Sequence, residues 1–313
     1  MNTDSIPFKI YSKILQKIPA PKLLINTAEP KSDPEDYREL ESGIYGEWVN
    51  LSSDNASAAL DSQGNLRGDF LRQPSITQTI HPNQRSVGVR IGCYLARTAI
   101  GSHLLASASE SLFGQPYLVQ PSFPCFSSSG LQSLSYIHLV YESWGINLVD
   151  SEKSIHFVDY GGGYGNMARF LVHLNDNIRV SILDLPSMLR LQKLYHLNTI
   201  SSGNALGRIE YRKSEFKNYQ ELTSQSPNSH LHFNATFSLN ESPLEARNCI
   251  EDTLLGAADT FFIAYSPEFY GINNETWADS LKARLCEDYF LLSGVLPGYK
   301  TSKYLTGKRK SML

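Results

Sequence analysis

The sequence has few cysteines and no long apolar run. Its four cysteines are far apart and form no Cys-x-x-Cys pair: Cys93, Cys125, Cys249 and Cys286. This spacing argues against a disulfide framework or a zinc knot, and favours buried free thiols in a reducing compartment. The first nine residues contain no apolar segment of signal-peptide length. No stretch approaches the roughly 18 apolar residues of a membrane span. We therefore expect a cytoplasmic protein without a membrane-spanning segment.

The sequence also lacks a strong charge imbalance. The formal net charge is −3, and basic residues cluster only at Lys308, Arg309 and Lys310. A nucleic-acid surface would require a broader basic patch, so we expect no nucleic-acid partner. Hydrophobic residues make up 41% of the chain and charged residues 19%, which is enough to build a full core.

The amino-terminal part of the chain is predicted to be helical and rich in loops. Ile10, Ile14, Leu15 and Ile18 are spaced as on a short helix. We expect a helix over 102–113 that ends at Gly114, a loop over 121–130, and a helix over 131–144. Residues 1–114 are interpreted as a cap, which leaves three roles open: a lid, a substrate-binding layer or the surface of a homodimer.

From Ile155 onward, predicted strands and helices alternate. The expected strands are Ile155–Asp159, Ile178–Asp184, Arg208–Tyr211, Ser229–Phe233 and Thr260–Tyr265. The expected helices are Tyr164–Leu174, one from Pro186, one from Pro243, and Trp277–Leu285. Two final strands, Tyr289–Leu296 and Lys300–Leu305, flank the turn residues Pro297 and Gly298. The pattern predicts an α/β, Rossmann-like, doubly wound and mostly parallel sheet closed by a C-terminal antiparallel hairpin.

The stretch Ile155–Pro186 indicates a nucleotide-type pocket. An apolar strand ends at Asp159 and breaks into glycines, and the next strand ends at Asp184. The run Gly163-Tyr-Gly-Asn-Met-Ala168 fits the GxGxxA pattern of NAD- and FAD-binding domains. A tight turn without a cofactor is a further alternative, although it leaves unexplained why both strands end in an acid.

Three features favour a different cofactor. A carboxylate at Asp159 repels a pyrophosphate but suits a ligand that carries an ammonium group. The glycines, at 161, 162, 163 and 165, are denser than NAD requires. The sheet is expected to end in a hairpin and not in further βαβ units.

The spacing Asp159-x-Gly161-x-Gly163-x-Gly165 resembles motif I of the class I S-adenosylmethionine-dependent methyltransferases. Leu183-Asp-Leu-Pro186 resembles the segment that follows the second strand in small-molecule O-methyltransferases. The glycine loop, Asp184-Leu-Pro186, Leu191-Gln192 and the segment from Asn234 to Glu241 are similar to the bacterial sugar O-methyltransferase family. This resemblance covers about residues 115 to 260 and implies a methyltransferase domain over 115–313. It also implies methyl transfer from S-adenosylmethionine to a sugar hydroxyl.

The resemblance also implies which residues hold the cofactor. The methionine part would lie against Asp159, Gly161, Gly163 and Gly165, with Tyr160 and Tyr164 packed over it. Asp184 would accept hydrogen bonds from the ribose, because a carboxylate is an acceptor with two oxygens. The remaining expected contacts are Leu185, Met188, Ser214, Glu215, Phe216 and Asn234.

Methyl transfer to a sugar hydroxyl requires a base or a metal ion, because the hydroxyl is a weak acid. Small-molecule relatives carry a histidine after strand four, whereas this chain has Asn240 there. We expect Glu241 to be the catalytic base and Glu268 to be the second candidate. Capping of the following helix is the alternative role for Glu241, and a solvated loop acid for Glu268. A magnesium ion held by both acids is a further alternative, and no metal site based on histidine is expected.

Three other polar residues carry weaker expectations. His232, which alternates with apolar neighbours in strand four, is interpreted as a core residue. His81 and Arg85 are candidates for reaching over the pocket to the acceptor. The acceptor is predicted to be a sugar in a glycan or sugar nucleotide. The alternatives are a small non-sugar natural product and a non-catalytic binding protein that keeps the fold.

Overall fold

The computed structural model describes residues 54, 56–78, 84–149, 151–224, 229–269 and 271–312. The short helix expected over 10–18 and His81 lie outside these residues. No helix within these ranges is long and apolar enough to cross a membrane.

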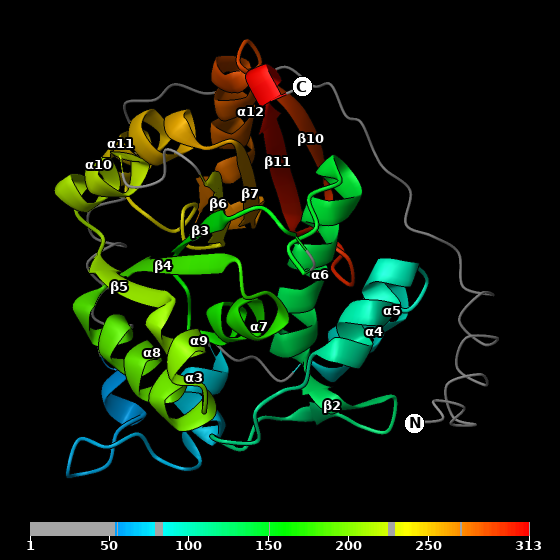
Figure 1. Ribbon diagram of the computed structural model, residues 1–313, viewed down its shortest axis with the longest axis vertical. Coiled ribbons are helices and arrows are strands. Elements are labelled where there is room, and N and C mark those ends of the chain that lie inside the picture. The colour runs from blue at the N-terminus through cyan, green and yellow to red at the C-terminus, as the bar shows by residue number, and fades with distance from the viewer. Residues whose placement is uncertain are drawn as a thin grey trace.

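A seven-stranded sheet forms the centre of the fold (Figure 1). From edge to edge its strands are β10 (Tyr289–Val295), β11 (Lys303–Arg309), β7 (Thr260–Tyr265), β6 (His230–Thr236), β3 (Ile155–Tyr160), β4 (Ile178–Asp184) and β5 (Ile209–Lys213). The five strands from β7 to β5 are parallel, whereas β11 pairs antiparallel with both β7 and β10. The predicted doubly wound sheet with its closing hairpin is therefore confirmed.

Residues that alternate along each strand face opposite layers of helices. All six residues of β3 are buried, as expected for a central strand covered on both faces. Phe157 contributes to one core cluster and Val158 to the other. Because parallel strands end at one edge of the sheet, Asp159 lies opposite both Ile182 and Asn234 in register.

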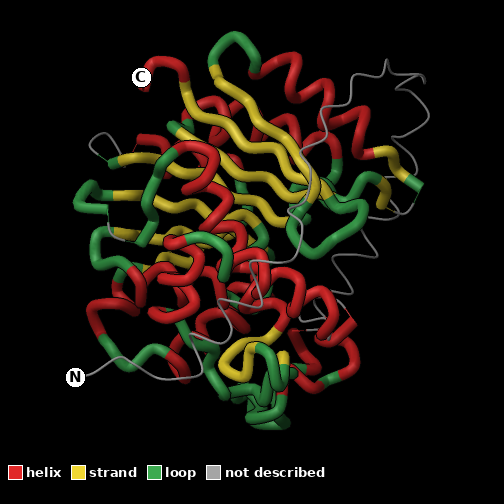
Figure 2. Tube along the Cα trace, turned by 90° about the vertical axis from the view of Figure 1, so that its right-hand side faces the viewer, coloured by secondary structure: helices red, strands yellow, loops and turns green. Residues whose placement is uncertain are grey.

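Two layers of helices cover the sheet. On one face lie α6 (Ser128–Trp144), α7 (Asn166–Leu174), α8 (Pro186–Thr199) and α9 (Gly203–Gly207). On the other face lie α10 (Phe216–Ser224), α11 (Leu244–Ile250), the π-helix η3 (Glu251–Leu255) and α12 (Asn274–Leu285). Figure 2 shows the twisted strands between these two layers. A small hairpin of β8 (Glu268–Phe269) and β9 (Ile272–Asn273) precedes α12, and η4 (Lys310–Met312) follows β11.

The preceding segments pack around α6 and α8. Helices α4 (Arg85–Leu95) and α5 (Ala99–Ser107) contact α6, as does the short strand β2 (Phe123–Ser127) near its start. The short strand β1 (Leu118–Val119) pairs with β2 and contacts α4. The 3-10 helix η2 (Phe70–Arg72) and α3 (Pro74–Gln78) contribute Phe70 and Ile76 to a third cluster with Tyr195 of α8.

Two local predictions in this part of the chain are wrong. The helix expected over 102–113 ends at Ser107, because the chain then extends and the Glu110 N–H donates to the Cys125 carbonyl at 3.0 Å. The loop expected over 121–130 contains strand β2, which pairs antiparallel with β1, and the first turn of α6. Ser127 caps α6 by accepting a hydrogen bond from the Gly130 N–H at 3.0 Å. Both errors arise from a pairing between segments that no local pattern reveals.

Candidate functional site

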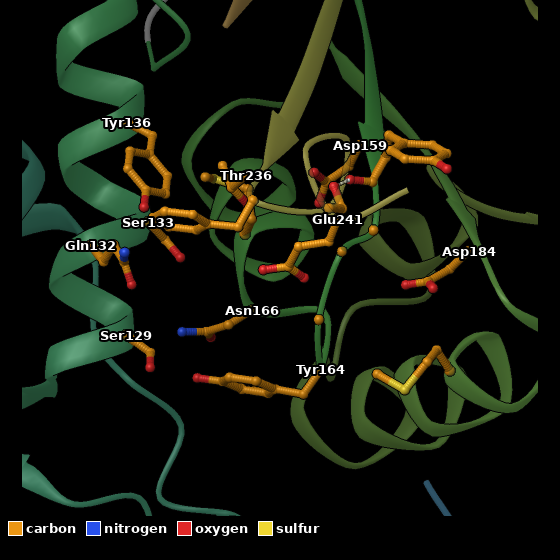
Figure 3. Close-up of a pocket in the computed structure, with 18 of the residues that line it drawn as sticks. Ser129, Gln132, Ser133, Tyr136, Asp159, Tyr164, Asn166, Asp184, Thr236 and Glu241 are labelled. Carbon is orange, nitrogen blue, oxygen red and sulfur yellow. Dashed lines mark hydrogen bonds between the residues drawn. The ribbon is translucent and has the colours of Figure 1, made fainter. Parts of the chain in front are cut away.

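A pocket of about 540 Å³ opens at the carboxyl ends of β3, β4 and β6, between the sheet and α6 (Figure 3). Its walls come from the glycine loop after β3, the loops after β4 and β6, one face of α6 and the turn between β10 and β11. Ligand sites of open α/β sheets lie at this edge.

The glycines of the loop after β3 bring backbone, and not side chains, to the pocket. Gly161, Gly163 and Gly165 all have positive φ angles, of 73°, 56° and 95°. A Cβ on Gly161 would lie 2.2 Å from that of Ser238, so the loop after β6 packs directly against this turn. A Cβ on Gly163 would meet no atom within 4 Å. Helix α7 consequently starts at Asn166, two residues after the predicted start at Tyr164.

Asp159 lies at the end of β3 with one carboxylate oxygen satisfied and one not. Asn234 of the neighbouring strand β6 donates a hydrogen bond to Oδ1 at 2.7 Å. Oδ2 is buried and has no hydrogen-bond partner. Burial raises the pKa of Asp159 to about 6, and the Asn234 hydrogen bond opposes this rise. A buried acceptor without a partner is costly, so this oxygen fits a donor group on a ligand.

Asp184 lies at the end of β4, on the other side of the glycine loop. It accepts hydrogen bonds from the Leu185 N–H at 2.8 Å and from Gln192 Nε2 at 2.7 Å. Gln192 Nε2 also donates to the Gly163 carbonyl at 2.9 Å, so one side chain fixes both the acid and the loop. Burial is the largest cause that raises the pKa of Asp184 to about 7, and these hydrogen bonds oppose it.

Glu241 projects into the pocket from the loop after β6. Figure 3 shows its carboxylate between Asp184 on one side and the α6 side chains on the other. Burial raises the pKa of Glu241 to about 8, against the positive charge of Arg247. A carboxyl group with a pKa near neutrality is suited to proton transfer.

Arg247 anchors the loop that carries Glu241. Its buried guanidinium donates to the carbonyls of Ser242 at 2.7 Å and Asn240 at 2.8 Å, on either side of Glu241. It also donates to Asn274 Oδ1 at 3.2 Å. The expected helix after Pro243 is present as α11, with Pro243 at its N-cap and no side-chain capping bond.

One face of α6 forms the wall opposite Glu241. Its pocket-lining residues are Ser129, Gln132, Ser133 and Tyr136, which recur at i, i+3, i+4 and i+7. Gln132 Nε2 donates to the Tyr299 hydroxyl at 2.7 Å, which connects α6 to the turn between β10 and β11. Gly298 has a φ of 84°, and a Cβ there would lie 2.7 Å from Ile91 Cγ1 of α4. The close packing of this turn on α4 places Tyr299 at the pocket.

A buried carboxylate, Glu110, joins this wall to the glycine loop. Its Oε2 accepts hydrogen bonds from the Ser127 N–H at 2.8 Å and the Ser127 hydroxyl at 2.6 Å. Its Oε1 accepts from the Tyr164 hydroxyl at 3.1 Å and from Asn166 Nδ2 at 2.8 Å. Glu110 therefore fixes the start of α6 relative to the start of α7.

The structure brings most of the residues expected to hold the cofactor to this pocket. Those that line it are Asp159, Tyr160, Gly161, Gly163, Tyr164, Asp184, Leu185, Met188 and Ser214. Gly165 and Asn234 support the site from behind: a Cβ on Gly165 would lie 2.7 Å from His196 Nε2, and Asn234 holds Asp159. Glu215 is exposed, and Phe216 begins α10 with its side chain outside the described residues. Neither is among the described lining residues.

The second catalytic candidate lies elsewhere. Glu268 is exposed on β8 and is not among the described residues that line the pocket. Arg85 is exposed at the start of α4 and does not belong to that lining set either. His232 is buried, stacks on Phe157 and hydrogen bonds Thr260 Oγ1 at 2.9 Å, in agreement with its interpretation as a core residue. Within the described ranges, no three His, Cys, Asp or Glu side chains are grouped closely enough to hold a metal ion.

Several lining residues were not predicted from the sequence. They include the α6 residues, Tyr299, Phe237, Asn166, Thr236, Ser238, Ser242, Ser266, Ser302 and Gln84. The α6 residues had a usable signal, because four polar residues share one face of a helix whose other positions are mostly apolar. No sequence signal marked Tyr299, which lines the pocket, or Glu110, which supports it, because only long-range packing brings these two residues to the site.

No protein-family model matches the sequence, and no curated protein matches it. Among solved structures, the methyltransferase domain of bacterial CtHen1 matches 56% of this chain and 97% of its own, at 13% identity and a TM-score of 0.42. A precorrin-6y C5,15-methyltransferase from Geobacter metallireducens matches 58% of this chain and 89% of its own (12% identity, TM-score 0.37). A SAM-dependent methyltransferase from Agrobacterium tumefaciens matches 62% of this chain and 66% of its own (9% identity, TM-score 0.42). Similarity at this level decides nothing about activity, so we infer function from the site's own residues.

Proposed function

We propose that this chain is an S-adenosylmethionine-dependent O-methyltransferase that methylates a hydroxyl of a sugar, in a glycan or a sugar nucleotide. The observation that carries the proposal is the placement of two carboxylates, Asp159 and Asp184, at adjacent strand ends on either side of the glycine loop. Neighbouring acids suit a ligand with a cationic and a hydroxylated end, and they disfavour a pyrophosphate. We interpret residues 115–313 as the methyltransferase domain and the part before it as its cap.

The residues present fit the cofactor's chemistry. The unpartnered Oδ2 of Asp159 suits the ammonium group of the methionine part, since a charged donor would satisfy it. Asp184, held by Gln192, suits the ribose hydroxyls. Met188 and Leu185 supply apolar contacts beside it, and the positive-φ glycines allow close approach of the ligand to backbone.

S-adenosylmethionine, when bound, supplies a methyl group on a positively charged sulfur. With the cofactor bound, the acceptor oxygen would take up this methyl group, and the electron pair of the broken carbon–sulfur bond would remain on sulfur. Glu241 receives the hydroxyl proton, and Arg247 fixes the loop that presents Glu241. A carboxylate so placed orients the hydroxyl as well as removing its proton.

The composition of the pocket supports a sugar acceptor. Its walls carry many hydroxyl and amide groups, including those of Ser129, Gln132, Ser133 and Tyr136 on α6. A small natural product with an aromatic or apolar body would be favoured by a drier and more apolar wall. A binding protein without activity would not require Glu241, which is half-buried and directed into the pocket.

Calorimetric titration of the protein with S-adenosylmethionine and S-adenosylhomocysteine tests the cofactor assignment. We expect binding to the wild type and a Kd raised about 10- to 100-fold in Asp184→Ala, because charge-assisted hydrogen bonds are lost. Asp252→Ala, at an exposed position of η3, is the matched control and should leave the Kd unchanged. Absence of binding, or an unchanged Kd in Asp184→Ala, would refute the assignment.

A further inference from the structure

The described residues that line the pocket include three acids, Asp159, Asp184 and Glu241, and no Lys, Arg or His. Two of the acids lie at the proposed cofactor end, so Glu241 is the ionisable group that faces α6 (Figure 3). The guanidinium of Arg90 lies behind the wall, where it donates to the Gly298 carbonyl at 2.9 and 2.6 Å. It is not among these lining residues.

Two buried hydroxyl groups on α6 face the pocket. Ser129 Oγ has no hydrogen-bond partner, and Tyr136 Oη lies near Gln132, whose amide nitrogen already donates to the Tyr299 hydroxyl at 2.7 Å. Both side chains point from α6 into the pocket (Figure 3). A buried hydroxyl without a partner costs free energy. Because the two hydroxyls lie seven residues apart on one helix face, they are about 10 Å apart along the helix axis. A ligand with several hydroxyl groups can satisfy both.

An aromatic pair, Phe237 and Tyr299, lies beside this face of α6, and Gln132 Nε2 of α6 donates to the Tyr299 hydroxyl at 2.7 Å. Phe237 follows β6 and has a φ of 69°, an uncommon conformation for a residue with a side chain. Its N–H donates to the Ala264 carbonyl at 2.8 Å, and its ring lies 6.5 Å from that of Tyr299, centroid to centroid. Both rings line the pocket. Aromatic faces beside hydroxyl donors combine an apolar and a polar surface within one site.

We infer that the part of the pocket lined by α6, Glu241 and the Phe237–Tyr299 pair is the acceptor subsite, and that it selects an uncharged sugar over an acidic sugar or a sugar phosphate. This inference rests on the proposed function and narrows its acceptor class. Sugar hydroxyls pair with Ser129 and Tyr136, and the aliphatic face of the ring packs on Phe237 and Tyr299. Above its pKa of about 8 Glu241 is ionised. A carboxylate or phosphate on the acceptor then meets this negative charge and no compensating cation among the described lining residues, and charge repulsion in a partly buried pocket is strong.

A matched pair of acceptor pools tests the inference. At about pH 9, where Glu241 is ionised, the wild type is incubated with methyl-labelled S-adenosylmethionine and one of two pools. One is a uronic-acid oligosaccharide pool, and the other is the same pool after its carboxyl groups have been reduced to hydroxymethyl groups. We expect at least about tenfold more label in the reduced pool. Equal or greater labelling of the acidic pool would overturn the inference. Absence of label in both pools, with cofactor binding intact by calorimetry, would overturn the sugar acceptor and this inference together. If the wild type does not bind S-adenosylmethionine in calorimetry, the proposed function itself is wrong.

Variants on α6 test the subsite directly. Ser129→Ala and Tyr136→Phe should each lower kcat/KM for the reduced pool by about tenfold through loss of one hydrogen bond. Their Kd for S-adenosylhomocysteine should not change. Ser133→Arg should shift the preference toward the acidic pool, because it adds a cation to the same wall. Tyr141→Phe, at a half-exposed position of α6 outside the pocket lining, is the matched control. Unchanged kcat/KM in both Ser129→Ala and Tyr136→Phe would place the acceptor elsewhere.

Discussion

Asn234 donates a 2.7 Å hydrogen bond to one oxygen of the Asp159 carboxylate, across the parallel pair β3 and β6. This bond holds the acid in one orientation and leaves its other buried oxygen without a partner. The arrangement stabilises the ionised carboxylate less than burial destabilises it, since the pKa of Asp159 is raised to about 6. Asp159 is therefore preorganised for a cationic ligand at a cost to the free protein.

The variant Asp159→Asn should separate ligand binding from stability. We expect the Kd for S-adenosylhomocysteine at pH 8 to rise about 10- to 100-fold, because the ammonium group loses its charged acceptor. The free energy of unfolding of the ligand-free protein at pH 8 should increase by about 1 kcal/mol or more, since a buried charge disappears. Calorimetry and urea denaturation measure the two quantities. A variant that loses stability while retaining affinity would contradict this account.

The variant Glu241→Gln should retain cofactor affinity and lose methyl transfer. Removal of the general base should lower kcat by about 100-fold or more, with the Kd for S-adenosylhomocysteine within about twofold of the wild type. The matched control is Glu245→Gln, at an exposed position of α11. Glu268→Gln should likewise retain activity, because Glu268 is exposed on β8. Transfer by Glu241→Gln near the wild-type rate would remove Glu241 from the mechanism.

The raised pKa values of the pocket acids predict a pH dependence of stability. Asp159 and Asp184 have folded pKa values of about 6 and 7, against an ordinary value of 3.8. Between pH 4 and 7 the folded state thus retains protons that the unfolded state has released, and the contribution of these groups to stability falls as the pH rises.

The comparison that isolates this effect is the wild type against Asp159→Asn/Asp184→Asn at each pH. This design is needed because buried histidines with lowered pKa values, such as His196, act in the opposite direction below about pH 6.5. The double variant should gain stability relative to the wild type as the pH rises from 4 to 8. Cofactor affinity of the wild type should increase over the same range, as the two acids ionise. A difference in unfolding free energy that does not vary with pH would contradict the prediction.

The variant Arg247→Ala should destabilise the fold and impair catalysis together. It leaves the buried carbonyls of Asn240 and Ser242 without their donor, which should cost about 2–4 kcal/mol of unfolding free energy. The position of Glu241 depends on the same loop, so kcat should fall more than KM rises. Arg247→Lys keeps the charge but supplies fewer directed donors, and it should recover stability in part. If the folded Arg247→Ala variant keeps the wild-type kcat, the loop that carries Glu241 does not depend on Arg247 for its position.

The variant Glu110→Ala should weaken the connection between α6 and α7. Four hydrogen bonds end on this buried carboxylate, so we expect a loss of about 3 kcal/mol in unfolding free energy. Activity at a temperature where the variant is folded should also fall, since Tyr164 and the start of α6 lose their common partner. Glu152→Ala, an exposed acid before β3, serves as the control. Wild-type stability in Glu110→Ala would contradict the assigned role.

The sequence by itself determined the parallel sheet, its closing hairpin and the half of the site that we propose holds the cofactor. Alternating apolar strands and helices admit few topologies, and the acids and glycines of this half are contiguous with the strands that carry them. One βαβ unit was therefore enough to predict that Asp159, Asp184 and the glycine loop lie together.

Only the tertiary structure decided the acceptor half. Tyr299 reaches the pocket because the hairpin turn packs on α4. Glu110 reaches the starts of α6 and α7 because its N–H donates to the Cys125 carbonyl of β2. The polar face of α6 can be assigned to the pocket only when the position of the helix against the open edge of the sheet is known. Contacts between residues more than a hundred positions apart, such as Gln132 and Tyr299, depend on packing that no local pattern encodes.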